Sequence, residues 1–130
     1  MSRFGSHSFD RILLEGMTFH GHTGALPFEK RDGQDFRVDL ELEFLRILAC
    51  DTDRIADTVD YGAVFEAVRQ VVEKERFDLI ERLAGAIAEK VLKAAPPVIS
   101  LVVTVRKPHA PIQGRFDAMG VTIRRERGND

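Results

Sequence analysis

Lys107 stands where a long apolar run meets a proline, and this position could give its amine a role in chemistry. The run Val98–Lys107 (VISLVVTVRK) is typical of a buried strand, and Pro108 must end that strand because proline cannot donate to a sheet ladder. A lysine at the mouth of such a strand is partly desolvated, which lowers the pKa of its ammonium group toward values useful in proton transfer. The alternative is a lysine that extends its amine into water. Position alone favours this alternative.

Three further side chains could bind a ligand or transfer a proton. Glu81 is the first acidic residue of an expected helix, where a carboxylate beside free backbone N–H groups suits an amidine-like N–C–N edge. The same glutamate could instead close a capping box and face the positive end of the helix dipole. Glu29 lies in a glycine-rich loop, where a glutamate is usually solvated. Tyr61, the only tyrosine, begins another expected helix and could either pack there or stack on a ligand and donate a proton.

Two histidines suggest a metal site only weakly. His20 and His22 are two residues apart, so on an extended segment both rings point the same way. A zinc site needs three or four ligands, and the other candidates (His7, His109 and Cys50) have no diagnostic spacing. We therefore expect no metal and no cofactor. The sequence also has no Ser/His/Asp pattern and no glycine loop of the kind that binds phosphate.

Length and composition indicate one ordinary globular domain. The chain has 130 residues, 44% hydrophobic content and a formal net charge of -2, which gives no field attracting nucleic acid or an anionic membrane. A single cysteine, Cys50, fits a reducing cytosol, and no apolar stretch reaches membrane-spanning length. We expect residues 1–9 to form a loose tail and residues 10–127 to form the domain.

The elements follow in the order strand, strand, helix, helix, strand, strand. The sequence predicts strands over 11–19, 36–44, 98–107 and 116–126, helices over 61–74 and 79–94, and irregular segments over 20–33, 50–57 and 108–114. Gly16 suggests a bulge in the first strand. Asp60 is the expected cap of the first helix, and Asp78 with Glu81 has the spacing of a capping box for the second.

This order predicts an α+β fold in which one antiparallel sheet carries both helices on one face. The second strand alternates apolar and charged residues, so its other face is charged, and a domain of this size has nothing to cover it. A four-stranded sheet also has two open edges. Both features are explained if several copies join edge to edge into a barrel with a wet interior. A single sheet with a solvated face is the alternative.

The chain resembles the dihydroneopterin aldolases from about Asp10 to Arg127. The landmarks, in order, are Leu14-Glu15-Gly16-Met17 with Phe19 and Gly21; Gly24-Ala25-Leu26 leading to Glu29; Gly33-Gln34 with Phe36 and Val38-Asp39; Thr58-Val59-Asp60-Tyr61; Leu79-Ile80-Glu81 with Leu83-Ala84; and Val105 to Pro108 with Ala110-Pro111. The resemblance implies the tunnel-forming T-fold, a four-stranded antiparallel sheet (ββααββ) with two helices on one face. In this family four subunits close a barrel, and two rings often stack into an octamer.

The resemblance also implies an activity that needs no metal. These enzymes are cytoplasmic lyases of tetrahydrofolate biosynthesis that cleave 7,8-dihydroneopterin by a retro-aldol step to 6-hydroxymethyl-7,8-dihydropterin and glycolaldehyde, and they can also epimerise the substrate to dihydromonapterin. The C6=N5 imine of the substrate is already an electron sink, so neither a Schiff base to lysine nor a metal is required. The protein must supply placement and proton transfer at the 2′-hydroxyl, N5 and the enamine carbon.

The family roles are carried over residue by residue. The catalytic residues implied are Lys107, Tyr61 and Glu29, and the substrate-binding residues are Glu81, Ile80, Val59, Asp60, Ala25 and Leu26. Glu81 resembles the anchor of the pterin amino-pyrimidine edge, and Tyr61 the tyrosine that a neighbouring subunit contributes. One position departs from the pattern: Thr23 stands where many members have histidine, which affects expectations for that loop alone.

Three other functions remain as alternatives. The nearest is a dihydroneopterin-triphosphate 2′-epimerase, which shares the fold and the retro-aldol cycle. The segment His20-Gly21-His22 suggests a zinc-dependent pyruvoyl-tetrahydropterin synthase type, although that family needs a third histidine and a catalytic cysteine. The last alternative is a non-catalytic ring that binds pterins or purines.

Overall fold

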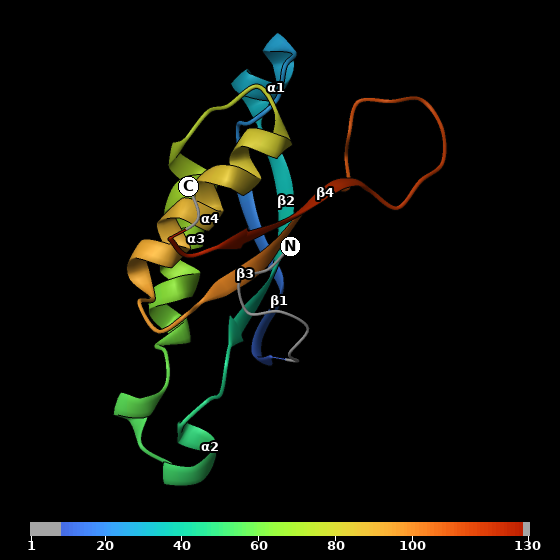
Figure 1. Ribbon diagram of the computed structural model, residues 1–130. Helices are drawn as coiled ribbons and strands as arrows, with labels where there is room; N and C mark the ends of the chain where they lie inside the picture. The colour runs from blue at the N-terminus through green and yellow to red at the C-terminus, as the bar shows by residue number, and fades with distance from the viewer. Residues whose placement is uncertain (1–8, 129–130) are drawn as a thin grey trace.

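The computed structural model describes residues 9–128, in which a four-stranded sheet carries two long helices on one face (Figure 1). The strands β1 (Asp10–Gly21), β2 (Gln34–Phe44), β3 (Ser100–Lys107) and β4 (Met119–Glu126) are antiparallel neighbours in chain order. The helices α3 (Tyr61–Lys74) and α4 (Ile80–Ala94) cover the sheet. The predicted α+β fold and element order are confirmed. Residues 1–8, most of the expected tail, lie outside the described residues.

The core lies between the sheet and the two helices. Every second residue of β2 points inward, and the fully buried side chains of the strands meet a buried stripe on each helix. The largest fully buried side chains are Phe36, Leu40, Leu42, Leu83, Ile87, Leu101, Val38, Val64, Val68, Val72, Val91 and Val98. The predicted cap of α3 is also confirmed, because the Asp60 carboxylate accepts from the N–H groups of Gly62 and Ala63, an arrangement that contributes about 1 kcal/mol.

The predicted bulge at Gly16 is present in β1. The pairing register with β2 shifts between Leu14 and Met17, and Gly16 has a φ of 69°, which L side chains rarely adopt. Its N–H donates to the Asp39 carboxylate at 2.6 Å. The bulge therefore has an acceptor of its own on β2, which compensates for the interrupted ladder.

Several boundaries differ from the sequence expectations. The segment 20–33 is only partly a loop, because β1 continues to Gly21 and Pro27 begins the short helix α1 (Pro27–Asp32), since proline suits the first turn of a helix. The segment 50–57 contains α2 (Ala49–Thr52) and the 3-10 turn η1 (Ile55–Asp57). Strand β4 begins at Met119 and not at 116, and the long loop before it extends away from the body (Figure 1).

The predicted capping box of α4 is wrong. The cap residue is Leu79, whose side chain makes no capping hydrogen bond. The Asp78 carboxylate instead accepts a hydrogen bond from the ammonium group of Lys30, which is far away in the sequence. Tertiary contact has therefore displaced the local capping interaction, and the first turn of α4 keeps its N–H groups free of side-chain caps.

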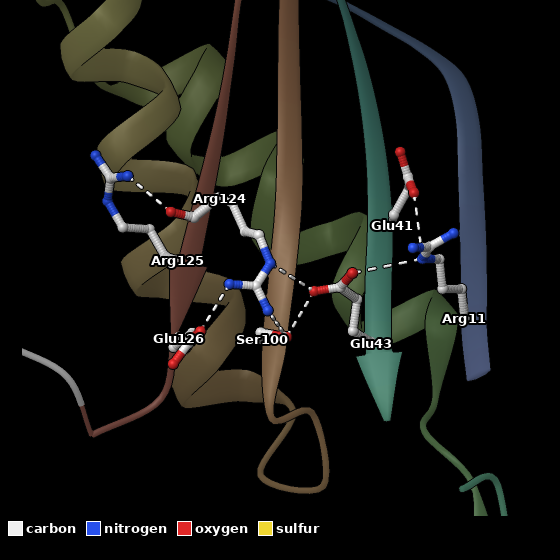
Figure 2. A network of polar contacts seen from close by, with 7 residues as sticks. All are labelled: Arg11, Glu41, Glu43, Ser100, Arg124, Arg125 and Glu126. Carbon is white, nitrogen blue, oxygen red and sulfur yellow. Dashed lines mark hydrogen bonds and ion pairs between the residues drawn. The ribbon is translucent and has the colours of Figure 1, made fainter. Parts of the chain in front are cut away.

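The charged face of the sheet is partly buried by its own ion pairs (Figure 2). Glu43 is 3% exposed; its carboxylate accepts from the Ser100 hydroxyl at 2.6 Å and from the Arg124 guanidinium at 3.1 Å, and the Arg11 guanidinium lies 3.4 Å away. The expectation that nothing within the domain covers this face is therefore wrong at this end of the sheet. The pairing across four strands satisfies a carboxylate that burial would otherwise destabilise.

The outer edges of β1 and β4 have no neighbouring strand within residues 9–128. In the same range no helix is long and apolar enough to cross a membrane.

Candidate active site

A buried ion pair joins the end of β3 to the short helix α1. The Lys107 ammonium lies 2.6 Å from the Glu29 carboxylate, and the two side chains are 14% and 3% exposed. Lys107 is the last residue of β3, as predicted, and α1 turns Glu29 inward although the sequence suggested a solvated loop position. The pair places a proton donor and a proton acceptor next to each other in a sheltered position.

Glu29 has three hydrogen-bond donors around its carboxylate. These are the Lys107 ammonium, the backbone N–H of Leu26 at 3.2 Å and the Gln34 amide at 3.0 Å. Burial raises the pKa of Glu29, but the hydrogen bonds and the charge of Lys107 together outweigh it and hold that pKa below the ordinary value of 4.5. Glu29 is therefore a carboxylate at neutral pH and keeps its partner lysine in place.

This lowered pKa predicts a loss of stability in acid. A group whose pKa is lower in the folded state stabilises the fold above its unfolded pKa, and this contribution is lost as the pH falls through the folded pKa. We compare the free energy of unfolding of wild type with that of the variant Glu29→Gln. Above about pH 5.5 the difference between the two should be constant. Below about pH 4.5 the wild type should lose stability relative to the variant, because only the wild type has a carboxylate to protonate at this position. Urea unfolding from pH 3 to 8 measures this, with the exposed Glu75→Gln as control. A difference that does not change with pH contradicts the prediction.

Gln34 belongs to the same cluster and was not predicted as a site residue. Its amide nitrogen donates to Glu29, which fixes the orientation of the amide, and its Oε1 atom is buried without a hydrogen-bond partner among the described residues. A buried, unused acceptor beside the Glu29–Lys107 ion pair is typical of a position that a ligand or water completes. In the sequence, Gln34 appeared only in the family landmark Gly33-Gln34, to which no functional role was assigned.

The predicted ligand-binding residues lie around the start of α4 and the loop after β1. Glu81 is exposed in the first turn of α4, and Ile80 beside it is half-buried. Since the cap residue Leu79 makes no side-chain hydrogen bond to the first turn, the carboxylate and the first N–H groups of the helix are presented together, as the binding interpretation requires. Ala25 and Leu26 are exposed in the loop that leads to Glu29.

Tyr61 lies elsewhere in the chain. It is 68% exposed at the start of α3, beside a hollow lined by the bulge of β1 and by Phe65. Val59 is buried and Asp60 caps the helix. Neither Glu29 nor Lys107 is among the residues that line this hollow.

The two histidines are neighbours, as the strand geometry predicted. The ring centroids of His20 and His22 are 5.5 Å apart. His20 contacts the Asp35 carboxylate at 3.3 Å and the Asp32 carbonyl at 3.0 Å, and His22 contacts the Lys30 carbonyl at 2.9 Å. No group of three potential metal-binding side chains occurs within residues 9–128. Both rings instead support the turn that carries α1.

Comparison with known proteins gives consistent matches over most of the chain. Residues 12–124 match the family model described as FolB, dihydroneopterin aldolase. A dihydroneopterin aldolase of Streptococcus pyogenes serotype M18 is 47% identical over 118 residues, which cover 91% of this chain and 99% of that protein. The crystal structure of Escherichia coli dihydroneopterin aldolase in complex with neopterin superposes with a TM-score of 0.80 at 28% identity, over 89% of this chain and 98% of that one. A Burkholderia dihydroneopterin aldolase bound to guanine gives 0.74 at 27% identity, with 92% of each chain covered.

Proposed function

This chain belongs to the dihydroneopterin aldolase family, and we propose that its Glu29–Lys107 pair transfers the protons of the retro-aldol cleavage of 7,8-dihydroneopterin. The observation that carries the proposal is the 2.6 Å contact between these two sheltered side chains. The family is a lyase family, so the reaction class follows from membership, whereas the roles of individual residues are proposals.

In each of the two stages of the proposed cleavage, the substrate gives up one proton and gains another. The Lys107 ammonium passes a proton to the Glu29 carboxylate, and the amine so formed takes the proton of the 2′-hydroxyl, directly or through a water. The C1′–C2′ bond then breaks, glycolaldehyde leaves with the new carbonyl, and the electron pair enters the C6=N5 imine as N5 gains a proton. The resulting enamine is protonated at C1′ and loses the N5 proton, which gives 6-hydroxymethyl-7,8-dihydropterin. The substrate supplies its own electron sink, so Lys107 needs no covalent bond to it.

We propose that the first turn of α4 anchors the pterin ring. Neopterin and guanine, the ligands of the two related crystal structures, share a 2-amino-4-oxo-pyrimidine edge. The exposed Glu81 carboxylate offers two acceptors to the amino group and the ring N–H, while free N–H groups near Ile80 offer donors. Ala25 and Leu26 would contact the ligand from the opposite loop. Gln34 Oε1, which has no hydrogen-bond partner among the described residues, would accept from a substrate hydroxyl.

We propose that Tyr61 serves the site of a neighbouring subunit, with backbone contacts from Val59 and Asp60. Its exposure, and its place beside a hollow that neither Glu29 nor Lys107 lines, support this assignment. Two inactive variants, Tyr61→Phe and Lys107→Met, should therefore regain part of their activity when they are unfolded, mixed and refolded together, because some sites in a mixed ring are intact. Turnover of the mixture measures this, and each variant refolded alone is the control. A mixture no more active than its components contradicts a shared site.

The open edges of β1 and β4 support a homo-oligomeric ring, a tetramer or octamer, and the exposed free Cys50 is compatible with a cytoplasmic location.

The deciding experiment is turnover of unphosphorylated 7,8-dihydroneopterin, with and without a chelator. Release of glycolaldehyde that chelation leaves unchanged supports the proposed aldolase. Epimer formation without glycolaldehyde indicates an epimerase. Activity lost with stoichiometric zinc indicates a metal-dependent mechanism.

A further inference from the structure

A cluster of polar contacts fastens the loop after β1 to the segment that precedes α4. We propose that Lys30 and Asp78, through this clasp (Thr23, Gly24, Lys30, Phe77 and Asp78), are positioning residues that fix the distance between the proton-transfer pair and the pterin anchor. The inference rests on the proposed function, because it assigns the two sides of the clasp to the two halves of one ligand site.

The side chain of Lys30 makes the central contact of the clasp. Its ammonium lies 2.5 Å from the Asp78 carboxylate and also donates to the carbonyl of Gly24. Lys30 is 36% exposed and Asp78 is 75% exposed. An exposed ion pair of this kind contributes little to global stability. Its effect is local, because one cation holds a loop carbonyl and a distant carboxylate together.

Hydrogen bonds from backbone N–H groups extend the clasp beyond this ion pair. The Gly24 N–H donates to the Phe77 carbonyl at 2.9 Å, and the Phe77 N–H donates to the Thr23 hydroxyl at 3.3 Å. The Arg76 guanidinium adds a contact to the Lys30 carbonyl at 3.3 Å. Thr23, the position that departs from the usual family pattern, is 1% exposed, and its side-chain hydroxyl is the acceptor for the Phe77 N–H.

Each side of the clasp lies next to a proposed site residue, in contact on one side and in sequence on the other. A Cβ atom at Gly24 would lie 2.6 Å from the Cβ and Cδ atoms of Glu29, so the backbone of Gly24 packs directly on the side chain that holds Lys107. On the other side, Asp78 is three residues before Glu81 and directly precedes Leu79, the cap of α4. Movement at the clasp therefore changes the separation of Glu29 and Glu81.

A change in this separation should affect catalysis more than binding of the pterin ring. The ring needs only the α4 side of the site, whereas cleavage needs the 2′-hydroxyl aligned with Lys107 at the same time. A misplacement of about 1 Å can cost about 100-fold in rate. The two effects can be separated with a ligand that lacks the cleavable side chain, such as the product 6-hydroxymethyl-7,8-dihydropterin.

The test compares Lys30→Met, Asp78→Ala and the double variant in the full-length protein. We expect Lys30→Met to lower kcat about tenfold and Asp78→Ala about threefold, while the dissociation constant of the product changes less than about twofold. The double variant should be no slower than Lys30→Met, because both changes remove the same contact. Arg31→Met is the matched control, since Arg31 also lies in α1 and pairs with its neighbour Asp32 without reaching the segment before α4.

The outcomes separate this inference from the proposed function. Wild-type protein that does not cleave dihydroneopterin would overturn the proposed function. An active wild type with Lys30→Met within twofold of Arg31→Met overturns the positioning role, as does a product affinity that falls in step with kcat, or losses that multiply in the double variant. If Lys30→Met does not fold, the exposed Asp78→Ala decides: a threefold loss of kcat with unchanged product affinity supports the role, and no loss overturns it.

Discussion

Lys107→Met should lower kcat for cleavage of 7,8-dihydroneopterin by about 10²- to 10⁴-fold, the contribution typical of a positioned general acid or base. The side chain of methionine keeps the apolar stem and removes the only ammonium that contacts Glu29 among the described residues. Binding of 6-hydroxymethyl-7,8-dihydropterin should change little, because we propose that the start of α4, and not Lys107, holds its ring. Steady-state turnover and product binding measure the two effects. Lys93→Met, an exposed position in the last turn of α4, is the control.

The same variant should also destabilise the fold, and this effect must be separated from catalysis. Glu29 stays buried without its cation, which costs about 1–3 kcal/mol in free energy of unfolding because a charged acceptor loses its strongest partner. Adding Glu29→Gln removes the buried charge. The double variant should therefore regain stability and remain inactive. Turnover by Lys107→Met within about threefold of wild type would rule out a catalytic lysine.

Glu81→Gln should weaken binding of 6-hydroxymethyl-7,8-dihydropterin by about 10- to 100-fold, since charge-assisted hydrogen bonds contribute about 1.5–3 kcal/mol. The glutamine amide also places N–H₂ opposite the amino group of the pterin, where an acceptor is needed. Isothermal titration with the product measures the change. Glu89→Gln is the control, because Glu89 lies further along the same helix and is exposed.

This variant also distinguishes the two roles that the sequence left open for Glu81. A capping glutamate would lose stability on substitution, whereas a ligand-binding glutamate would lose affinity. In the structure no side chain caps α4 and Asp78 is bound to Lys30, so the melting temperature of Glu81→Gln should stay close to that of wild type. A lowered melting temperature with unchanged product affinity would restore the capping role.

The sequence by itself determined the four strands, the two long helices and the residue types available for chemistry. Alternation along β2, the helical stripes of α3 and α4, Asp60 as a cap and Gly16 as a bulge all depend on residues close in the chain, and all are confirmed. Lys107 at the end of β3 also followed from local signals, namely an apolar run and the proline after it.

Only the tertiary structure decided how these residues are used. Contacts between distant segments turned Glu29 from an expected solvated position into the buried partner of Lys107, brought Gln34 to the same carboxylate, and moved Asp78 from helix cap to clasp. The reason is physical: the pattern of a sequence records which face of an element is apolar, whereas the partner of a buried charge is set by which segments the fold brings together. The position of Lys107 is predictable from its strand, whereas its ion-pair partner Glu29 belongs to another segment, which only the fold brings to it.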